Sequence, residues 1–428
     1  MSDTSSQTLR IQGIPPFVDA SLRLGRRITA ITGDNGVGKT VILDALYFML
    51  TGHWPGGRVV APGVMETEPV VQVRFGEQVK TSIYNRRARY WLDTERPLTD
   101  QVMVISLDAK GGTTIFDPLK HETDFSPSHH LVVPLHLSEQ DLWYGAHQYE
   151  RDFSGTVVSK KTACRGFVED LATWKAKSSS IYSAFEEILR YLSPPNEEIR
   201  ISDFQRIDLS DSLYVPILQM SYGSIPATKA SAGIKKILGL AYGIIWAIER
   251  HLDFAKITAM KKSRTLILLV DEIEGHFHPK WQRVIVKALW FAVRDAWGSD
   301  DVQLVFTTHA PLVMAGAEDI ADPNLDTQVL VDLEGTPPQA VINASPWTKH
   351  GTVADWLDSQ QFGEVLQSSD AYANAHAALA TLIAQDHASD EEIANLQTQL
   401  QAALPDDDPA WQEWSWFLED RKLQAKAL

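Results

Sequence analysis

Short stretches in which apolar and polar residues alternate dominate the first third of the chain. Residues 9–31 contain LRIQGI, ASLRL and RITAIT, and residues 69–117 contain VVQVRF, TSIYN and QVMVISL. This alternation is typical of strands with one buried face. Between the two regions, the mostly apolar VILDALYFMLTG ends at Gly52, which predicts a buried helix stopped by a glycine. The pattern therefore predicts a β-rich lobe around one buried helix.

The spacing of apolar residues lengthens to three and four in the middle of the chain. RGFVEDLATW and IYSAFEEILRYL predict helices within residues 160–193, and ASAGIKKILGLAYGIIWAIERHL predicts a long apolar helix. After it, TLILLVDE, VQLVFTTHAP and TQVLVDLEG contain continuous apolar runs, typical of strands buried on both faces. From residue 346 the chain becomes rich in Ala, Gln and Asp, and we expect only helices there.

These changes divide the chain into four segments. We expect an N-terminal lobe over residues 1–117, an insertion that is helical over 118–215, a second lobe over 216–345 and a helical tail over 346–428. The alternation of strands with helices in the two lobes places the fold in the α/β class.

Composition is that of a globular protein from a reducing compartment. The 428 residues are 44% hydrophobic and 22% charged, which is ample for a core. Cys164 is the single cysteine, so no intrachain disulfide can form. The polar start MSDTSSQTLR does not resemble a secretory signal, and no apolar run approaches the ~18 residues of a membrane span. We therefore expect a cytoplasmic location and no membrane partner.

The net charge of −16 argues against indiscriminate binding to DNA, because lysine and arginine drive the binding of phosphate backbones. NRRARYW is the best local exception, since Arg86, Arg87 and Arg89 precede Tyr90 and Trp91. A solvated hairpin is the favoured interpretation, and nucleic acid stays open as a partner.

A glycine-rich loop follows the strand RITAIT and precedes the buried helix. The loop GDNGVGKT consists of Gly33, Asp34, Asn35, Gly36, Val37, Gly38, Lys39 and Thr40. In such a loop the backbone N–H groups and the positive end of the following helix bind phosphates. We expect Lys39 to reach the β- and γ-phosphates and the Thr40 hydroxyl to bind Mg²⁺.

Two later strands end in residues that suit the same chemistry. Asp271 and Glu272 follow LILLV at the edge of the sheet where ligands bind in open α/β folds. Asp271 is the candidate Mg²⁺ ligand, and Glu272 is the candidate base for an attacking water. His309 ends VFTTHAP, a strand expected beside that of Asp271, where an imidazole can contact the γ-phosphate. In isolation, a strand end with solvated acids and a hydrogen-bonded histidine would explain all three.

The start of the long apolar helix is a second candidate anion site. Ser231 precedes it and is a good N-cap residue. The free N–H groups of a helix that starts with small residues bind anions well. The periodicity of the sequence does not indicate whose phosphate this helix would meet.

In chain order the four motifs are the glycine-rich loop, the SAG helix start, LLVDE and TTHAP. Together they resemble the head of ABC-type ATPases of the SMC, RecF and OLD kind. GDNGVGKT resembles the G-x-N-G-x-G-K-S/T of that group, and DEIEGHFHPKWQ resembles the D-E-I-E-x-H-L-H-P-x-W-Q block of its stand-alone bacterial members. The resemblance covers residues 9–335. It implies an α/β P-loop fold with a central, mostly parallel sheet and an antiparallel β subdomain, which here carries an insertion and a tail.

The resemblance also implies how the site is used. ATP and Mg²⁺ are the expected ligands, and two chains are expected to close around ATP as a homodimer. Ser231 and Gly233 would then act on the ATP held by the partner's loop, and Glu274 and His276 would lie in the segment that links the two sites.

The sequence departs from the pattern of the group at a few positions. SAG replaces the usual S-G-G, THA replaces T-H-S, and the glutamine of the Q-loop is not assigned, with Gln140 and Gln72 as candidates. His276 and His278 also form an H-x-H pair, but no further Cys/His set accompanies them as a metal site would need.

The tail predicts two further helices. Ser389 and Glu392 form a capping box, and SDEEIANLQTQLQAAL carries one apolar stripe. Trp411, Trp414 and Phe417 fall near one face of the next helix, either as packing residues or as a docking surface for another protein. TVADWLDSQQFGE resembles a segment that follows the core of anti-phage defence ATPases paired with a nuclease.

We therefore expect an ATPase that binds ATP, dimerises around it and regulates a separately encoded effector in anti-phage defence of the Septu or retron-linked type. An HNH nuclease is the first candidate for the effector. The alternatives are a RecF-like repair ATPase acting on DNA ends or gaps and an ATP-bound scaffold without turnover.

Overall fold

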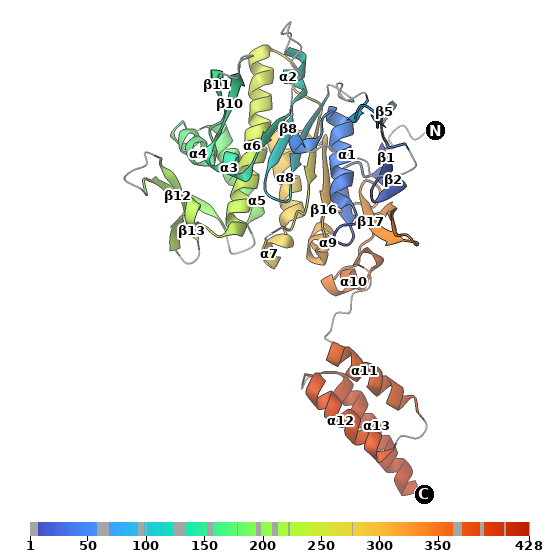
Figure 1. Ribbon diagram of the computed structural model, residues 1–428. Helices are drawn as coiled ribbons and strands as arrows, with labels where there is room; N and C mark the ends of the chain where they lie inside the picture. Colours follow the sequence, from blue (N-terminus) through green and yellow to red (C-terminus); the bar gives the residue numbers. More distant parts are fainter. Residues whose placement is uncertain are drawn as a thin grey trace. The chain divides into compact units, whose positions relative to one another are not determined.

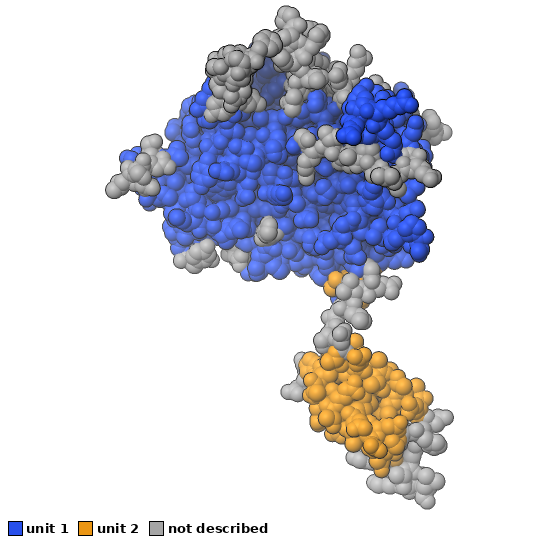
Figure 2. Space-filling model, in the orientation of Figure 1, with its two compact units in different colours: residues 1–356, 360–362 blue, residues 357–359, 363–428 orange. Residues whose placement is uncertain are grey.

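The chain folds into two compact units, which are described separately (Figure 2). Unit 1 comprises residues 1–356 and 360–362, and unit 2 comprises residues 357–359 and 363–428. The computed structural model describes residues 7–57, 68–92, 98, 101–123, 134–151, 157–177, 179–193, 198–207, 213–220, 223–275, 277–362, 370–385, 389–405 and 408–427.

The described strands all lie in unit 1. In chain order they are β1 (Gln7–Ile14), β2 (Phe17–Leu24), β3 (Ile28–Thr32), β4 (Val70–Phe75), β5 (Gln78–Asn85), β6 (Tyr90–Trp91), β7 (Val102–Leu107), β8 (Thr113–Phe116), β9 (Leu135–Leu137), β10 (Ala146–Arg151), β11 (Val157–Cys164), β12 (Arg200–Gln205), β13 (Val215–Met220), β14 (Gly223–Pro226), β15 (Thr265–Val270), β16 (Val302–Thr307), β17 (Thr327–Glu334) and β18 (Gln339–Pro346).

Helices occur in both units. Up to residue 362 the α-helices are α1 (Lys39–Thr51), α2 (Pro118–Thr123), α3 (Glu139–Tyr144), α4 (Phe167–Ala176), α5 (Ser180–Leu192), α6 (Ala232–Thr258), α7 (Pro279–Gln282), α8 (Ile285–Trp297), α9 (Pro311–Ala317) and α10 (Val353–Leu357). Short 3₁₀ helices are η1 (Pro55–Gly57), η2 (Ala227–Lys229) and η3 (Gln360–Phe362). Unit 2 contains α11 (Asp370–Ile383), α12 (Asp390–Ala403) and α13 (Ala410–Ala427).

An eight-stranded sheet forms the centre of unit 1, in the order β18-β17-β3-β16-β15-β7-β8-β9 (Figure 1). The five strands from β17 to β7 are mutually parallel, whereas β18, β8 and β9 pair antiparallel at the two sides. The parallel strands therefore end at one edge of the sheet. Because β3 lies one strand away from β15, with β16 between them, the loops after these three strands meet at that edge.

Both faces of the central sheet are buried, which explains the continuous apolar runs in the sequence. Within β15, Leu266 and Leu268 belong to the core on one face, where α6 and α8 pack. Ile267 and Leu269 belong to the core on the other face, where α1 packs. Successive side chains of a strand point to opposite faces. Both sets of side chains are therefore buried in a strand that is covered on both sides, and nearly every position is apolar.

A second, antiparallel sheet accompanies α1 and has the order β2-β1-β4-β5-β6. Its inward residues, among them Leu9, Ile11 and Val73, share a core with α1 and with one face of the central sheet. A mostly parallel central sheet is thus combined with an antiparallel subdomain, as the sequence resemblance implied. The predicted α/β fold class is thus confirmed.

Residues 118–215 are not helical throughout. They contain α2, α3, α4 and α5, but also β9, the paired strands β10 and β11, and β12, which pairs with β13. The sequences AHQYER and RISDFQ of β10 and β12 are largely polar, so apolar periodicity did not indicate them as strands.

Unit 2 has its own core, formed by α11, α12 and α13. Leu396, Leu400 and Leu404 are buried in it, and Ser389 and Glu392 make the expected capping box at the start of α12. Trp414 is also buried in this core, and Trp411 and Phe417 are partly buried against it. These three aromatic residues therefore stabilise unit 2 itself rather than form an open surface. In the described part of the chain, no helix is sufficiently long and apolar to cross a membrane.

Candidate nucleotide-binding site

The glycine-rich loop connects the end of β3 to the start of α1, as the sequence predicts. Gly33 and Gly38 adopt left-handed φ angles of +134° and +103°. A Cβ atom on Gly33 would lie 2.1 Å from the carbonyl oxygen of Val331, and one on Gly38 would lie 2.8 Å from the ring of Phe17. Only glycine fits at either position, because the backbone of the loop packs closely against Val331 and Phe17.

The remaining loop residues leave a phosphate room to bind. Asp34, Asn35 and Gly36 are exposed, whereas Val37 is buried and anchors the loop. The N-terminus of α1 has no side-chain cap, and its first turn contains no acidic residue. Its N–H groups and the positive end of its dipole therefore stay available to an anion.

Lys39 is a buried cation at the base of this loop, with 7% of its surface exposed. Its ammonium donates hydrogen bonds of 2.7 Å to the carbonyl oxygens of Gly33 and Asp34. Burial lowers the pKa of Lys39, and the carboxylates of Glu274 and Glu272 act in the opposite direction. Phosphate oxygens would give this ammonium the anionic partners that the carbonyl groups replace here.

Thr40 and Asp271, the two candidate metal ligands, are directly hydrogen-bonded although they lie far apart in the sequence. The Thr40 hydroxyl donates to Oδ2 of Asp271 at 2.8 Å, and the Thr307 hydroxyl donates to Oδ1 at 2.7 Å. A hydroxyl and a carboxylate are hard oxygen donors, which fit Mg²⁺. Thr307 was not singled out in the sequence, although it lies two residues before His309 in the quoted strand.

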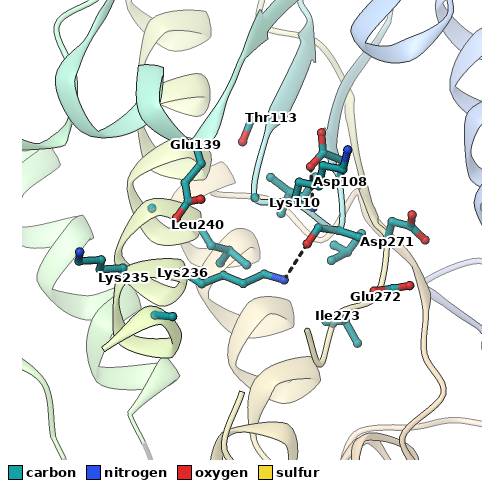
Figure 3. Close-up of a pocket in the computed structure, with 16 residues that line it drawn as sticks. Asp108, Lys110, Thr113, Glu139, Lys235, Lys236, Leu240, Asp271, Glu272 and Ile273 are labelled. Carbon is teal, nitrogen blue, oxygen red and sulfur yellow. Dashed lines mark hydrogen bonds between the residues drawn. The ribbon is translucent and has the colours of Figure 1, made fainter. Parts of the chain in front are cut away.

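Glu272 follows in a sharp turn after β15. Its φ angle is +47°, which residues other than glycine rarely adopt, and its amide donates a 2.7 Å hydrogen bond to the Thr307 hydroxyl. Glu272 also borders a cavity of about 190 Å³ beneath the first turns of α6 (Figure 3). In that cavity Lys236 donates to the carbonyl oxygen of Ala109 at 3.3 Å, and burial lowers its pKa.

His309 lies beside this turn because β16 pairs with β15 in parallel, as expected. Its ring is 48% exposed, and Nδ1 lies 2.8 Å from Oε1 of Glu274. The backbone amide of His309 donates to the same oxygen at 2.7 Å. The sequence resemblance implied only that Glu274 lies in a segment linking two sites, and it did not predict this contact with His309.

Ser231 caps α6 as expected, accepting a 3.5 Å hydrogen bond from the amide of Ile234. Ser231 and Ala232 are exposed and Gly233 is half-buried, so the start of α6 is open to a further molecule. The neighbouring Lys235 and Lys236 line the cavity next to Glu272.

Neither candidate glutamine is hydrogen-bonded to this cluster. Gln72 lies in β4 of the antiparallel sheet and donates to Thr81 at 2.8 Å, and Gln140 is exposed on α3. Asp108 follows β7 instead, and its Oδ1 accepts 2.9 Å hydrogen bonds from the amides of Lys110 and Gly112.

Two other groups singled out in the sequence have structural explanations or lie outside the described residues. His278 caps α7, and His276 is not among the described residues. The arginine-rich segment is a β5–β6 hairpin with Arg86, Arg87 and Arg89 exposed at its turn. Trp91 of the hairpin is buried against α1.

Comparison with known proteins gives matches over the part of the chain that carries these residues. The model of the family AAA_21, "AAA domain, putative AbiEii toxin, Type IV TA system", matches residues 28–315, which is more than half of the chain. The Septu protein PtuA of Bacillus thuringiensis is 23% identical over 322 residues, or 72% of each chain. The retron Vc95 probable ATPase of Vibrio cholerae serotype O1 biovar El Tor is 28% identical over 133 residues, covering 30% of this chain and 24% of that protein.

Among solved structures, the SMC head domain from Thermotoga maritima aligns with 80% of this chain and 99% of its own, at 13% identity and a TM-score of 0.38. The recombination mediator protein RecF aligns with 79% of this chain and 98% of its own, at 11% identity and a TM-score of 0.37.

Proposed function

The chain belongs to the AAA_21 family, and on that basis we propose that it binds ATP with Mg²⁺ at the β3–α1 loop and hydrolyses it to ADP and phosphate. One observation carries the proposal. The hydroxyl of Thr307 bonds both the carboxylate of Asp271 and the amide of Glu272, while Asp271 also bonds Thr40 of the loop. Candidate phosphate, metal and base residues from three strands thus meet at one edge of the sheet.

Each residue has a defined part in the proposed reaction. Lys39 and the N–H groups of the loop bind the phosphates, and Thr40 and Asp271 would hold Mg²⁺, which would neutralise charge on the γ-phosphate. Glu272 accepts a proton from the attacking water, and His309 contacts the γ-phosphate.

We further propose that two chains close around ATP as a homodimer, in which Ser231 and Gly233 contact the nucleotide of the partner. The exposed start of α6 supports this arrangement. Ser231 caps the helix, and the exposed residues Ser231 and Ala232 leave its first N–H groups accessible to an anion.

The proposed biological role is regulation of a separately encoded effector, with an HNH nuclease as first candidate, in cytoplasmic defence against phage. The similarity to a Septu protein and to a retron ATPase supports this role. In this role the ATP state would be passed on to another protein.

Steady-state hydrolysis of ATP by the purified chain tests the proposal. We expect Mg²⁺-dependent phosphate release that is lost in Lys39→Ala, together with little stimulation by DNA. Strong stimulation by DNA ends or gaps would favour a repair ATPase, and binding of ATP without turnover would favour a scaffold.

A further inference from the structure

Glu274 is a buried carboxylate whose contacts the proposed reaction has not used. It lies two residues after Glu272, and only 3% of its surface is exposed. Its Oε1 atom lies 2.8 Å from Nδ1 of His309 and accepts a 2.7 Å hydrogen bond from the backbone amide of the same residue. One oxygen thus holds both the main chain and the ring of His309.

The turn that carries Glu274 is itself well ordered by backbone hydrogen bonds. The amide of Ile273 donates to Thr307 at 3.1 Å, and the amide of Phe277 donates to the carbonyl oxygen of Glu274 at 2.9 Å. The amide of Gly275 donates to Glu272 at 2.8 Å. Because the amides of the residues directly before and after Glu274, Ile273 and Gly275, are hydrogen-bonded, its carboxylate can set the orientation of His309 rather than follow it.

The contact determines which ring nitrogen carries the hydrogen. An ionised carboxylate only accepts hydrogen bonds, so Nδ1 of His309 must donate to Oε1 of Glu274. Nε2 is then the nitrogen left for the nucleotide, and it can donate to a phosphate oxygen when the ring is protonated on both nitrogens; the side chain of His309 is 48% exposed. A histidine ring held at Nδ1 cannot turn about its side-chain bonds without losing that hydrogen bond.

The second carboxylate oxygen of Glu274 makes no hydrogen bond that would stabilise the folded protein. Oε2 is buried and has no hydrogen-bond partner among the described residues. A buried, unsatisfied carboxylate oxygen destabilises a folded protein, so its presence needs another reason. Glu318, in contrast, accepts hydrogen bonds from the ring of Trp356 and from the amides of His350 and Gly351.

We propose that Glu274 is a positioning residue that accepts a hydrogen bond from Nδ1–H of His309 and so directs Nε2 to the nucleotide, where Nε2 carries a hydrogen in the imidazolium form of the ring and donates to a γ-phosphate oxygen. This inference rests on the proposed ATPase function, and Glu274 acts through His309 rather than on the nucleotide. Glu274 and His309 would act on the ATP bound by their own chain. This positioning role is distinct from the proton-accepting role of Glu272.

Turnover measurements with a double-mutant cycle test the inference. We expect Glu274→Ala to lower kcat about 10- to 100-fold, the range for losing a group that orients another, with little change in KM for ATP. Glu274→Gln should recover most of the loss, because its amide oxygen can accept both hydrogen bonds. Combined with His309→Ala, Glu274→Ala should cost nothing beyond the single His309→Ala change.

Glu318→Ala provides the matched control, since it also removes a buried carboxylate that accepts backbone hydrogen bonds. We expect it to lower the melting temperature but to leave kcat of the folded protein unchanged. The inference would be overturned if the kcat losses of the two single variants multiply in the double variant. Normal turnover of Glu274→Ala or of His309→Ala would overturn it as well.

A spectroscopic measurement separates this inference from the ATPase proposal. Long-range ¹⁵N–¹H spectra of histidine-labelled protein, with the His309 signals identified by their absence in His309→Ala, report the tautomer without any turnover. We expect the Nδ1–H form in the parent chain and its loss in Glu274→Ala. A parent chain in which Nδ1 of His309 carries no hydrogen contradicts the inference even if ATP is hydrolysed, and a chain without turnover contradicts the ATPase proposal even if Nδ1 is found to carry a hydrogen.

Discussion

Glu272 combines a candidate catalytic side chain with a backbone conformation that costs free energy. Its φ angle of +47° lies in the left-handed region, which costs a residue with a Cβ atom about 1–2 kcal/mol. The hydrogen bond from its amide to Thr307 helps to hold that conformation. Strain of this kind concentrates at functional sites, since it fixes a side chain in a position that regular structure does not offer.

The side chain of Glu272 is the first target for mutation. Glu272→Gln retains the size of the side chain but removes the base, so we expect turnover to fall by roughly 100-fold or more. ATP affinity should be retained, because Lys39 and the loop are unchanged. Rapid-quench turnover and equilibrium binding of ATP measure the two quantities, and a variant that hydrolyses ATP like the parent would show that Glu272 is misassigned.

Thr307 offers a more specific test of how Asp271 and Glu272 are held. Thr307→Val is nearly isosteric but removes the hydroxyl that joins them, and we expect kcat to fall about 10-fold or more, the scale for lost orienting contacts. Thr307→Ser retains the hydroxyl and should remain close to the parent. Equal losses in the two variants would indicate that packing of the methyl group, rather than the hydrogen bonds, matters at this position.

At the scale of elements, the sequence predicted best those features that depend on local pattern. The strands ending at Asp271 and His309 were expected side by side because apolar strands of an α/β fold bring their carboxyl ends together, and β15 and β16 do pair. The strands β10 and β12 were missed because their polar sequences carry no apolar alternation. The contact of Glu274 with His309 depends on the backbone path after β15, which residue types alone do not specify.

The helix α6 carries the proposed dimer contact, which can be tested apart from nucleotide binding. Ser231→Arg adds a long cationic side chain at the exposed helix start, so we expect it to block ATP-dependent dimerisation while each chain still binds ATP. Light scattering of the Glu272→Gln protein, with and without Ser231→Arg, measures the mass of the complex in ATP.

Ser389→Arg is the matched control for that experiment, because Ser389 is also an exposed N-cap residue, but of α12 in unit 2. Both substitutions remove a helix cap, which costs about 1 kcal/mol, and only the change at Ser231 should prevent the dimer. Dimerisation that survives Ser231→Arg would exclude α6 from the interface.

At the scale of the whole molecule, the boundary between the two units indicates where the chain can be divided. Trp356 is fully buried, and its ring N–H donates to Glu318 at 2.8 Å. Gln361 accepts a 2.5 Å hydrogen bond from the hydroxyl of Thr32, directly before the glycine-rich loop. Residues 346–356 and 360–362 therefore belong to unit 1, although the sequence predicted that the helical tail begins at residue 346.

A chain that ends at Phe362 should therefore keep the ATPase and lose the proposed effector. We expect it to remain soluble and to hydrolyse ATP at the parent rate, because the core of unit 2 is formed by its own helices. Co-purification with the effector should be abolished if unit 2 carries the docking surface.

Deleting only residues 406–428 is the informative comparison. That deletion removes Trp414 from the core of unit 2 and exposes Leu396 and Leu400, whose lost burial costs several kcal/mol at about 1.5–3 kcal/mol for each large apolar side chain. We expect the shorter deletion to aggregate or to be proteolysed in unit 2, whereas the chain ending at Phe362 remains intact. If the chain ending at Phe362 still binds the effector, the docking surface lies on the ATPase unit, and unit 2 must serve another purpose.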